Sequence, residues 1–191
     1  MKKFLSVFLA GILCLGLVAC GNDSAPTNTK KEDTKQEEKK DIKKEEKKGK
    51  TITVKEEGMV GNLGIKVLET KESNAISNES GKSAPSGKFI ILKLELKNNG
   101  EQATEYSGSD FKLKNDRIIY EVDDNSFQAL GYLNTQETIY NKNKNFIGVY
   151  DKFNPGITKN TYIVFDIPKE VKIEDLKLVV KQDKNTEFNL K

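Results

Sequence analysis

The sequence predicts an all-β domain, an antiparallel β-sandwich, preceded by an export signal and a disordered charged linker. Apolar and polar residues alternate in several short segments, turn-forming residues separate these segments, and no long window has helical periodicity. Short strands joined by turns, without helical crossovers, are typical of a sandwich. The predicted boundaries are residues 1–19 for the signal peptide, residues 20–50 for Cys20 and the linker that follows it, and residues 51–191 for the domain.

The N-terminus has the layout of a signal peptide. Lys2 and Lys3 precede an apolar run from Phe4 to Val18, and a strongly polar tract follows at once. The run is short for a permanent membrane span, and it contains two glycines. The sequence therefore predicts a cleaved export signal.

The end of this signal, Leu17-Val18-Ala19-Cys20, resembles the lipobox of bacterial lipoproteins. The resemblance implies that the Cys20 thiol takes a diacylglyceryl group and that cleavage makes Cys20 the first residue. Cys14 is the rival position, but Leu13 before it does not give the small-residue pattern that cleavage needs. After cleavage Cys20 has no partner for an intramolecular disulfide. Two acyl chains such as palmitate are enough for stable anchoring at the outer face of the cell membrane.

The predicted linker is densely charged. Residues 30–50 contain ten lysines and seven acidic residues, and Ile42 is their one large apolar side chain. Such a segment cannot bury a core. As a flexible coil, residues 21–50 would span about 30 Å. A spacer is the favoured interpretation, and contact of the lysines with anionic lipid or wall polymers is the alternative.

The charge of the domain excludes one class of partner. Residues 51–191 carry 20 basic and 21 acidic side chains, so the domain is close to neutral. Binding to DNA or RNA requires a basic surface. We therefore expect no nucleic-acid partner.

Period-two alternation predicts the strands in order along the chain. The apolar residues that share one side of each strand are Ile52 and Val54; Leu63, Ile65 and Val67; Ile90, Leu92, Leu94 and Leu96; Ile163, Phe165 and Ile167; Leu176, Leu178 and Val180; and Phe188 and Leu190.

A hairpin is predicted around the turn Asn115-Asp116. A two-residue turn there would pair Leu113 with Ile118 and Phe111 with Tyr120, which brings the apolar sides together. A slightly longer turn remains the alternative, because Asp is less favourable than Gly at the second position.

Two further connections follow from turn chemistry. Asn154-Pro155-Gly156 predicts a turn before the strand that ends at Ile167. The stretch from Ser73 to Gly87 is predicted to be a long polar hairpin loop.

One segment has helical spacing. Phe127, Leu130 and Leu133 would share a helix face, and Ser126 could cap the helix, but Gly131 interrupts it. At most a short helix is predicted.

The order of these signals resembles a known family. The motifs are Gly64-Ile65-Lys66-Val67, the strand from Phe89 to Asn99, Phe111-Lys112-Leu113, Asn154-Pro155-Gly156 and Phe165-Asp166-Ile167-Pro168. Together they resemble the immunoglobulin-like domain of unknown function common in Gram-positive lipoproteins, within the mycobacterial immunoprotective extracellular antigen superfamily. The resemblance spans about residues 58–182 and implies an immunoglobulin-like sandwich. It implies no activity and no catalytic residues.

The residue types limit the possible chemistry. The sequence has no histidine, and the domain has no cysteine, which excludes Ser-His-Asp and Cys-His catalysis and the usual transition-metal sites. Asp123 and Asp124 are weak candidates for Ca²⁺, and a solvated turn is the favoured interpretation. We expect no cofactor and no catalytic residues. A hydrolase that uses paired carboxylates remains conceivable among the acidic residues.

Aromatic residues gather between Asn125 and Pro155. They suggest a binding surface, because aromatic side chains in loops give large contact areas. The candidates are Tyr132, Tyr140, Phe146, Tyr150 and Phe153. The favoured alternative is that these rings close the core, with Phe146 to Tyr150 forming another strand.

Together these observations predict a membrane-anchored extracellular lipoprotein whose domain is a non-catalytic binding module for an unidentified envelope or extracellular partner. The alternatives are an envelope hydrolase and a sensor of a small ligand or Ca²⁺.

Overall fold

The computed structural model describes residues 49–116 and 118–191. The predicted signal peptide, Cys20 and nearly all of the linker lie outside these residues. Among the helices in the described ranges, none has both the length and the apolar character that a bilayer crossing requires.

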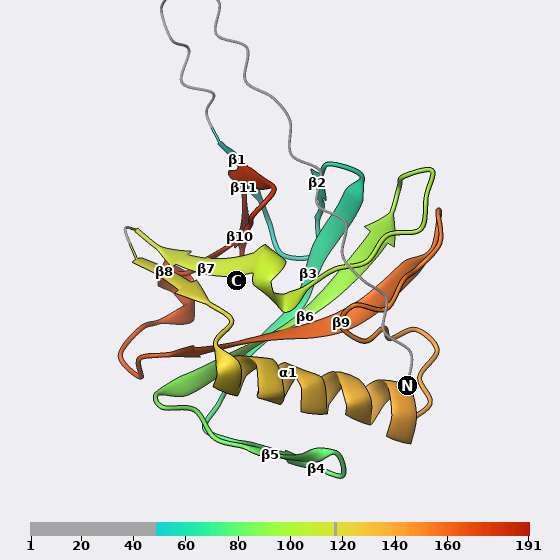
Figure 1. Cartoon of the computed structure of the whole chain (residues 1–191). Helices are drawn as coiled ribbons and strands as arrows, with labels where there is room; N and C mark the ends of the chain where they lie inside the picture. The colour runs from blue at the N-terminus through green and yellow to red at the C-terminus, as the bar shows by residue number, and fades with distance from the viewer. Residues whose placement is uncertain (1–48, 117) are drawn as a thin grey trace, which may run out of the picture. The chain divides into compact units, whose positions relative to one another are not determined.

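Two β-sheets stack into a sandwich (Figure 1). The first sheet has the spatial order β1 (Lys50–Ile52), β11 (Asp183–Asn189), β10 (Lys177–Val180), β7 (Phe111–Asn115) and β8 (Ile118–Glu121). The second has the order β2 (Glu57–Val60), β3 (Leu63–Ser73), β6 (Lys88–Asn98) and β9 (Thr158–Ile167). The predicted all-β sandwich is confirmed.

The strand pairs are antiparallel with one exception. The long strand β6 lies between β3 and β9, so that Leu94 pairs with Val67 on one side and with Thr161 on the other. At the edge of the first sheet, β1 runs parallel to β11, with Lys50 opposite Thr186. The antiparallel prediction therefore holds for every described pair except this short one.

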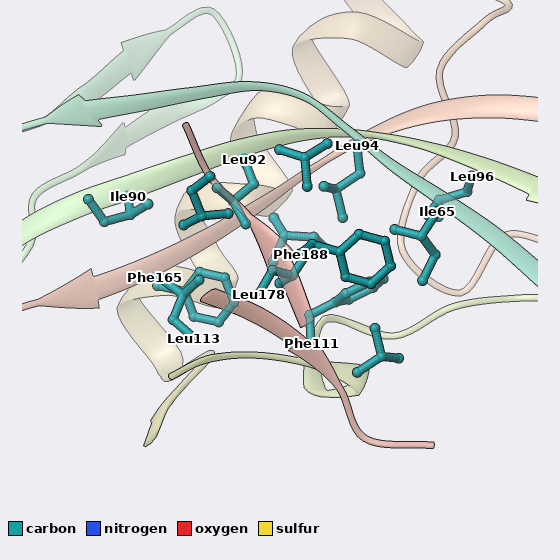
Figure 2. Packing of buried hydrophobic residues seen from close by; sticks show 14 of the residues in the cluster. Ile65, Ile90, Leu92, Leu94, Leu96, Phe111, Leu113, Phe165, Leu178 and Phe188 are labelled. Atoms are coloured by element: carbon teal, nitrogen blue, oxygen red, sulfur yellow. The ribbon is translucent and has the colours of Figure 1, made fainter. Parts of the chain in front are cut away.

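The main core fills the space between the sheets. The four apolar residues predicted to share one side of β6 are all 0% exposed. Figure 2 shows them beside Leu113, Leu178 and Phe188 from the opposite sheet. Burying each such side chain stabilises the fold by about 1.5–3 kcal/mol. The alternation of the sequence thus predicts the core face correctly.

A helix covers the outer face of the second sheet. Helix α1 (Asp124–Thr135) continues into a π-helical turn, η2 (Gln136–Tyr140), and lies across β6 and β9 (Figure 1). Phe89 and Val164 on the sheet form a second buried cluster with Ala129 and Leu130 on the helix. The domain therefore has three layers.

The helix is longer than predicted, and its cap is a different residue. Asp123 is the N-cap, and its Oδ1 accepts a hydrogen bond from the Ser126 N–H at 2.8 Å. Ser126 is buried inside the helix, where its Oγ accepts from the Asp166 N–H at 2.7 Å. Gly131 does not end the helix, because glycine costs only about 1 kcal/mol relative to alanine there.

Replacing Gly131 with alanine should raise the free energy of unfolding by about 0.5–1 kcal/mol. A Cβ at this position has no atom within 4 Å, so nothing opposes the gain in helix propensity. Urea denaturation measures the change. Gly156→Ala is the matched control: its Cβ also meets open space, but its φ of 75° makes alanine unfavourable. A loss of stability in Gly131→Ala would contradict the prediction.

The β7–β8 hairpin forms, but its predicted register is wrong. Leu113 pairs with Tyr120, and Asn115 pairs with Ile118, so the turn lies one residue later than predicted. Asp116 adopts a φ of 45°, a left-handed conformation that Asp tolerates better than most residues. The two-residue shift keeps Leu113 and Tyr120 on one side, so the core face is unchanged.

The predicted turn at residues 154–156 is confirmed by the Ile157 N–H, which donates to the Asn154 carbonyl at 3.2 Å.

Two other segments differ from the sequence prediction. The stretch from Ser73 to Gly87 contains a small hairpin, β4 (Ile76–Asn78) with β5 (Gly81–Ser83), which packs against α1. The predicted strand from Phe146 to Tyr150 is wrong, because only Phe146 makes an isolated bridge, to Asn160. The chain then turns, with the Asp151 carboxylate accepting from the Gly148 N–H at 3.1 Å. The remaining short 3-10 helices are η1 (Gly108–Asp110) and η3 (Ile173–Asp175).

Candidate functional site

A cleft of about 750 Å³ lies at one end of the sandwich. Its walls come from both sheets: the β2–β3 turn and the end of β6 on one side, and the start of β7 and the end of β10 on the other. The loop after β6, residues 99–105, completes the rim. The Asn99 N–H donates to the Asn62 carbonyl at 2.9 Å and joins this loop to the β2–β3 turn. The cleft has the size of many small-ligand sites.

Side-chain amides dominate the polar lining of the cleft. They belong to Asn62, Asn98, Asn99, Gln102 and Gln182. Each amide can donate two hydrogen bonds and accept two. Asn62, Asn99 and Gln102 are exposed, so they can offer these groups to a ligand.

The charged side chains of the cleft are all acidic. Glu101, Glu105 and Asp110 line it, and none of the described lining residues is Lys or Arg. Glu101 and Glu105 lie exposed on the rim. Because opposite charges attract and like charges repel, this lining favours a cationic or neutral ligand over an anionic one.

The side chain of Asn98 holds the loop that forms the rim in place. It is only 1% exposed. Its Nδ2 donates to the carbonyls of Gln102 at 2.8 Å and Phe153 at 3.0 Å, and its Oδ1 accepts from the Gly100 N–H at 2.9 Å. The side chain therefore substitutes for backbone partners that the irregular loop lacks.

Asn98→Ala should lower the free energy of unfolding by roughly 2–3 kcal/mol, because it removes three hydrogen bonds that hold the loop to the end of β6. The neighbouring Asn99→Ala should change it by less than about 0.5 kcal/mol, because Asn99 is exposed. Chemical denaturation of the two variants measures the difference. Equal losses would contradict the structural role given to Asn98.

Asp110 joins the connection between β6 and β7 to the turn that follows β10. Its Oδ2 accepts from the Ser107 N–H at 2.8 Å, and its Oδ1 accepts from the Gln182 Nε2 at 3.2 Å. The Asp110 carbonyl also accepts from the Lys181 N–H at 2.8 Å. Asp110 is thus engaged with the protein, whereas the carboxylates of the rim face solvent.

Tyr106 supports the floor from inside the core. Its ring packs edge-on against Phe111, which lines the cleft, with the ring centroids 6.3 Å apart. Its hydroxyl donates to the Thr161 hydroxyl and also lies 3.3 Å from the Ile147 carbonyl. Asn134 of α1 accepts from the same Thr161 hydroxyl at 3.2 Å. A buried polar chain therefore links the helix, the second sheet and the cleft floor.

Burial raises the pKa of the Tyr106 phenol well above its ordinary value, although the hydrogen bond with Thr161 opposes the shift. The folded state then holds this proton more tightly than the unfolded state, whose phenol titrates near pH 10. The stabilisation is complete below about pH 10 and is lost as the pH rises above it, by up to about 1.4 kcal/mol per pH unit.

Tyr106→Phe should therefore make the decline of stability above pH 10 shallower than in the wild type. Unfolding free energies between pH 8 and 11.5 measure the slopes. Tyr140→Phe is the control, because Tyr140 is 48% exposed and lies outside the core. Identical slopes for Tyr106→Phe and the wild type would contradict the assignment.

The aromatic residues predicted to form a binding surface do not act as one set. Phe146 and Phe153 are buried, Tyr132 is half-buried, and Tyr140 and Tyr150 are exposed. None of these five lines the cleft. Phe153 nevertheless supports the rim, because its backbone exchanges hydrogen bonds of 2.9 and 3.1 Å with Thr104. The core-closing interpretation is correct for Phe153, which belongs to the main core, whereas Phe146 is buried against Tyr162 with the ring centroids 5.2 Å apart.

The weak calcium candidates lie elsewhere. Asp123 caps α1, and Asp124 is exposed in its first turn. Within residues 49–116 and 118–191, no three acidic, histidine or cysteine side chains form a group that could hold a metal ion. The cleft carboxylates are therefore not arranged as a metal site.

Sequence reasoning missed the residues of the cleft. The available signal was the run Asn98-Asn99-Gly100-Glu101-Gln102, which places polar and acidic residues directly after the longest apolar alternation. Loops that follow strands often carry binding residues. The other cleft residues, on the β2–β3 turn and at the end of β10, have no comparable signal in the sequence.

The cleft offers side-chain amides for hydrogen bonding and negatively charged carboxylates. Fold and site together define a β-sandwich domain with a polar, acidic cleft formed by its loops. The chain belongs to the family described as "Domain of unknown function (DUF4352)", which matches residues 52–187. The family resemblance predicted from the motif order is confirmed.

Several solved structures are similar to the chain. A conserved hypothetical protein from Bacillus anthracis has 19% identity and a TM-score of 0.51, with 71% of this chain and 94% of that chain covered. An uncharacterized β-sandwich protein from Clostridium difficile 630 has 23% identity and a TM-score of 0.49, with 78% and 99% covered. The secreted protein MPT63 from Mycobacterium tuberculosis has 14% identity and a TM-score of 0.48, with 73% and 95% covered. A comparison with curated proteins gives no match.

Proposed function

We propose that this chain is a non-catalytic binding module, held at the outer face of the cell membrane by lipid on Cys20, and that the polar cleft takes its partner. The observation that carries the proposal is the cleft itself: exposed amides and carboxylates surround a volume large enough for a ligand. No histidine is present in the sequence to act as a base. Binding therefore explains the cleft more simply than catalysis does, because binding needs no catalytic base.

The place of Gly49 and Lys50 in the domain supports a partner in the cell envelope. Gly49, the first described residue, lies beside the Asn185 carbonyl, and Lys50 pairs with Thr186 in the middle of β11. Gln182, just before β11, lines the cleft. The chain thus enters the domain at the end that carries the cleft. A linker with a reach of about 30 Å would let the cleft meet envelope components close to the membrane.

Photo-crosslinking on intact cells tests this proposal. A photoreactive phenylalanine analogue replaces Gln102, on the cleft rim, in the full chain. A matched variant carries it at Gln128, which is exposed on α1. We expect a discrete adduct from position 102 and none from position 128. No adduct at 102, or the same adducts from both positions, would contradict the proposal.

A hydrolase remains the second candidate, because Glu101 and Glu105 line the same cleft and glycosidases use paired carboxylates. Purified full chain, incubated with isolated cell walls, should release no reducing ends if the module only binds. Release that is lost in Glu105→Gln would favour the hydrolase.

A further inference from the structure

We propose that the ligand of the cleft is a glycan without anionic groups, and that an amino sugar is bound in preference to its N-acetylated form. This inference rests on the proposed binding function and specifies the chemistry of the same site.

The amides of the cleft match the hydrogen-bonding pattern of a sugar. Each sugar hydroxyl both donates and accepts a hydrogen bond, and so does each side-chain amide. Asn62, Asn99 and Gln102 are exposed and belong to two neighbouring loops, whose backbones are joined by the 2.9 Å bond between Asn99 and Asn62. Because the loops hold each other in place, part of the ordering cost is met before the ligand binds.

The cleft also has an apolar contribution beside these amides. Leu63 is partly exposed in its lining, above the buried side chains of Val60, Phe111 and Val180. Specific pockets usually combine apolar walls with a few polar groups that fix orientation. A pyranose ring has both properties, because its C–H faces are apolar and its edge carries hydroxyls. An inorganic ion or a short polyamine would gain little from contact with the apolar part of the lining.

The charges decide which glycan fits. Glu101 and Glu105 on the rim and Asp110 at the base all carry negative charge, and no described lysine or arginine lines the cleft to offset it. A polymer with phosphate or carboxylate groups would meet repulsion in a partly desolvated site. A protonated amine would be attracted, and its binding would weaken as salt increases.

Calorimetric titration of the processed full chain in detergent micelles tests the inference with three probes. They are a hexamer of glucosamine, a hexamer of N-acetylglucosamine and a linear polyphosphate. We expect saturable binding of both sugars, tighter for glucosamine by at least about threefold at low salt, and no binding of polyphosphate. Polyphosphate binding as tightly as the sugars, or no saturable sugar binding, would overturn the inference.

Variants locate the binding. Asn99→Ala combined with Gln102→Ala should weaken both sugars by about tenfold or more, because two exposed hydrogen-bonding groups are lost. Glu101→Gln combined with Glu105→Gln should remove the preference for glucosamine while keeping binding of the N-acetylated hexamer. Gln128→Ala on α1 should bind like the wild type. Sugar affinity that stays within twofold in the Asn99/Gln102 variant would overturn the inference.

The outcome separates this inference from the broader proposal. If the photoreactive residue at position 102 captures a protein while both sugars fail to bind, the glycan inference is wrong and the binding module stands. If position 102 captures nothing and no sugar binds, both are wrong.

Discussion

Truncating Leu94 to alanine should lower the free energy of unfolding by about 2–5 kcal/mol. Leu94 is 0% exposed in the middle of β6, the strand that pairs with both β3 and β9. Strands on both sides restrict the backbone shifts that would close the cavity. Urea or guanidinium denaturation, followed by circular dichroism, measures the loss.

Leu68→Ala is the matched control for this change. Leu68 is half-buried on β3, at the irregularity between Val67 and Glu69, and the same atoms are removed. We expect a loss of about 1 kcal/mol there, because less apolar area leaves the interior. Equal losses in the two variants would contradict the assignment of the core to the inner face of β6.

Cys20→Ala should abolish lipid attachment and move the domain out of the membrane fraction. Two acyl chains, at about 0.8 kcal/mol per buried methylene, supply the anchoring energy, and alanine offers no thiol to carry them. Fractionation of cells fed a labelled fatty acid measures both effects. The wild type should carry the label and sediment with membranes.

The matched control is Cys14→Ala, which removes the other cysteine of the signal region and should leave labelling unchanged. An unprocessed Cys20→Ala chain that stays in the membrane fraction would contradict lipid anchoring. It would instead indicate an uncleaved signal anchor.

The inner faces of the strands could be predicted because each has one buried side. Ile163, Phe165 and Ile167 on β9 illustrate this, since all three are at most 1% exposed. Alternation reports burial on one face directly, and turn residues mark where a strand stops. The predicted position of the turn near Asp116 was one residue too early, because Asn and Asp fit several turn positions.

The third layer could have been predicted from the same strands. Phe89 and Ile91 interrupt the alternation of β6, and Val164 interrupts that of β9. Continuous apolar runs indicate that both faces of a strand are covered. These residues lie under α1 or pack against that cluster. The strand pattern therefore contained a signal for the helix that the helix's own sequence, with Gly131 inside it, expressed only weakly.

The cleft could not be predicted, for a physical reason. Its residues come from segments as far apart as Asn62 and Gln182, and loop side chains have no periodicity that would indicate which of them converge. The neighbours Asn98 and Asn99 show the difficulty. Asn98 is 1% exposed and holds the loop, whereas Asn99 is exposed to solvent. Only the path of the backbone in three dimensions shows which of the two side chains is buried.

Amide hydrogen exchange of the full chain, with and without isolated cell envelopes, tests most directly whether the cleft is the binding site. We predict slower exchange in residues 61–63 and 98–105 when envelopes are present, and unchanged exchange in residues 124–150. Protection confined to residues 124–150, or no protection in either region, would contradict the assignment of binding to the cleft.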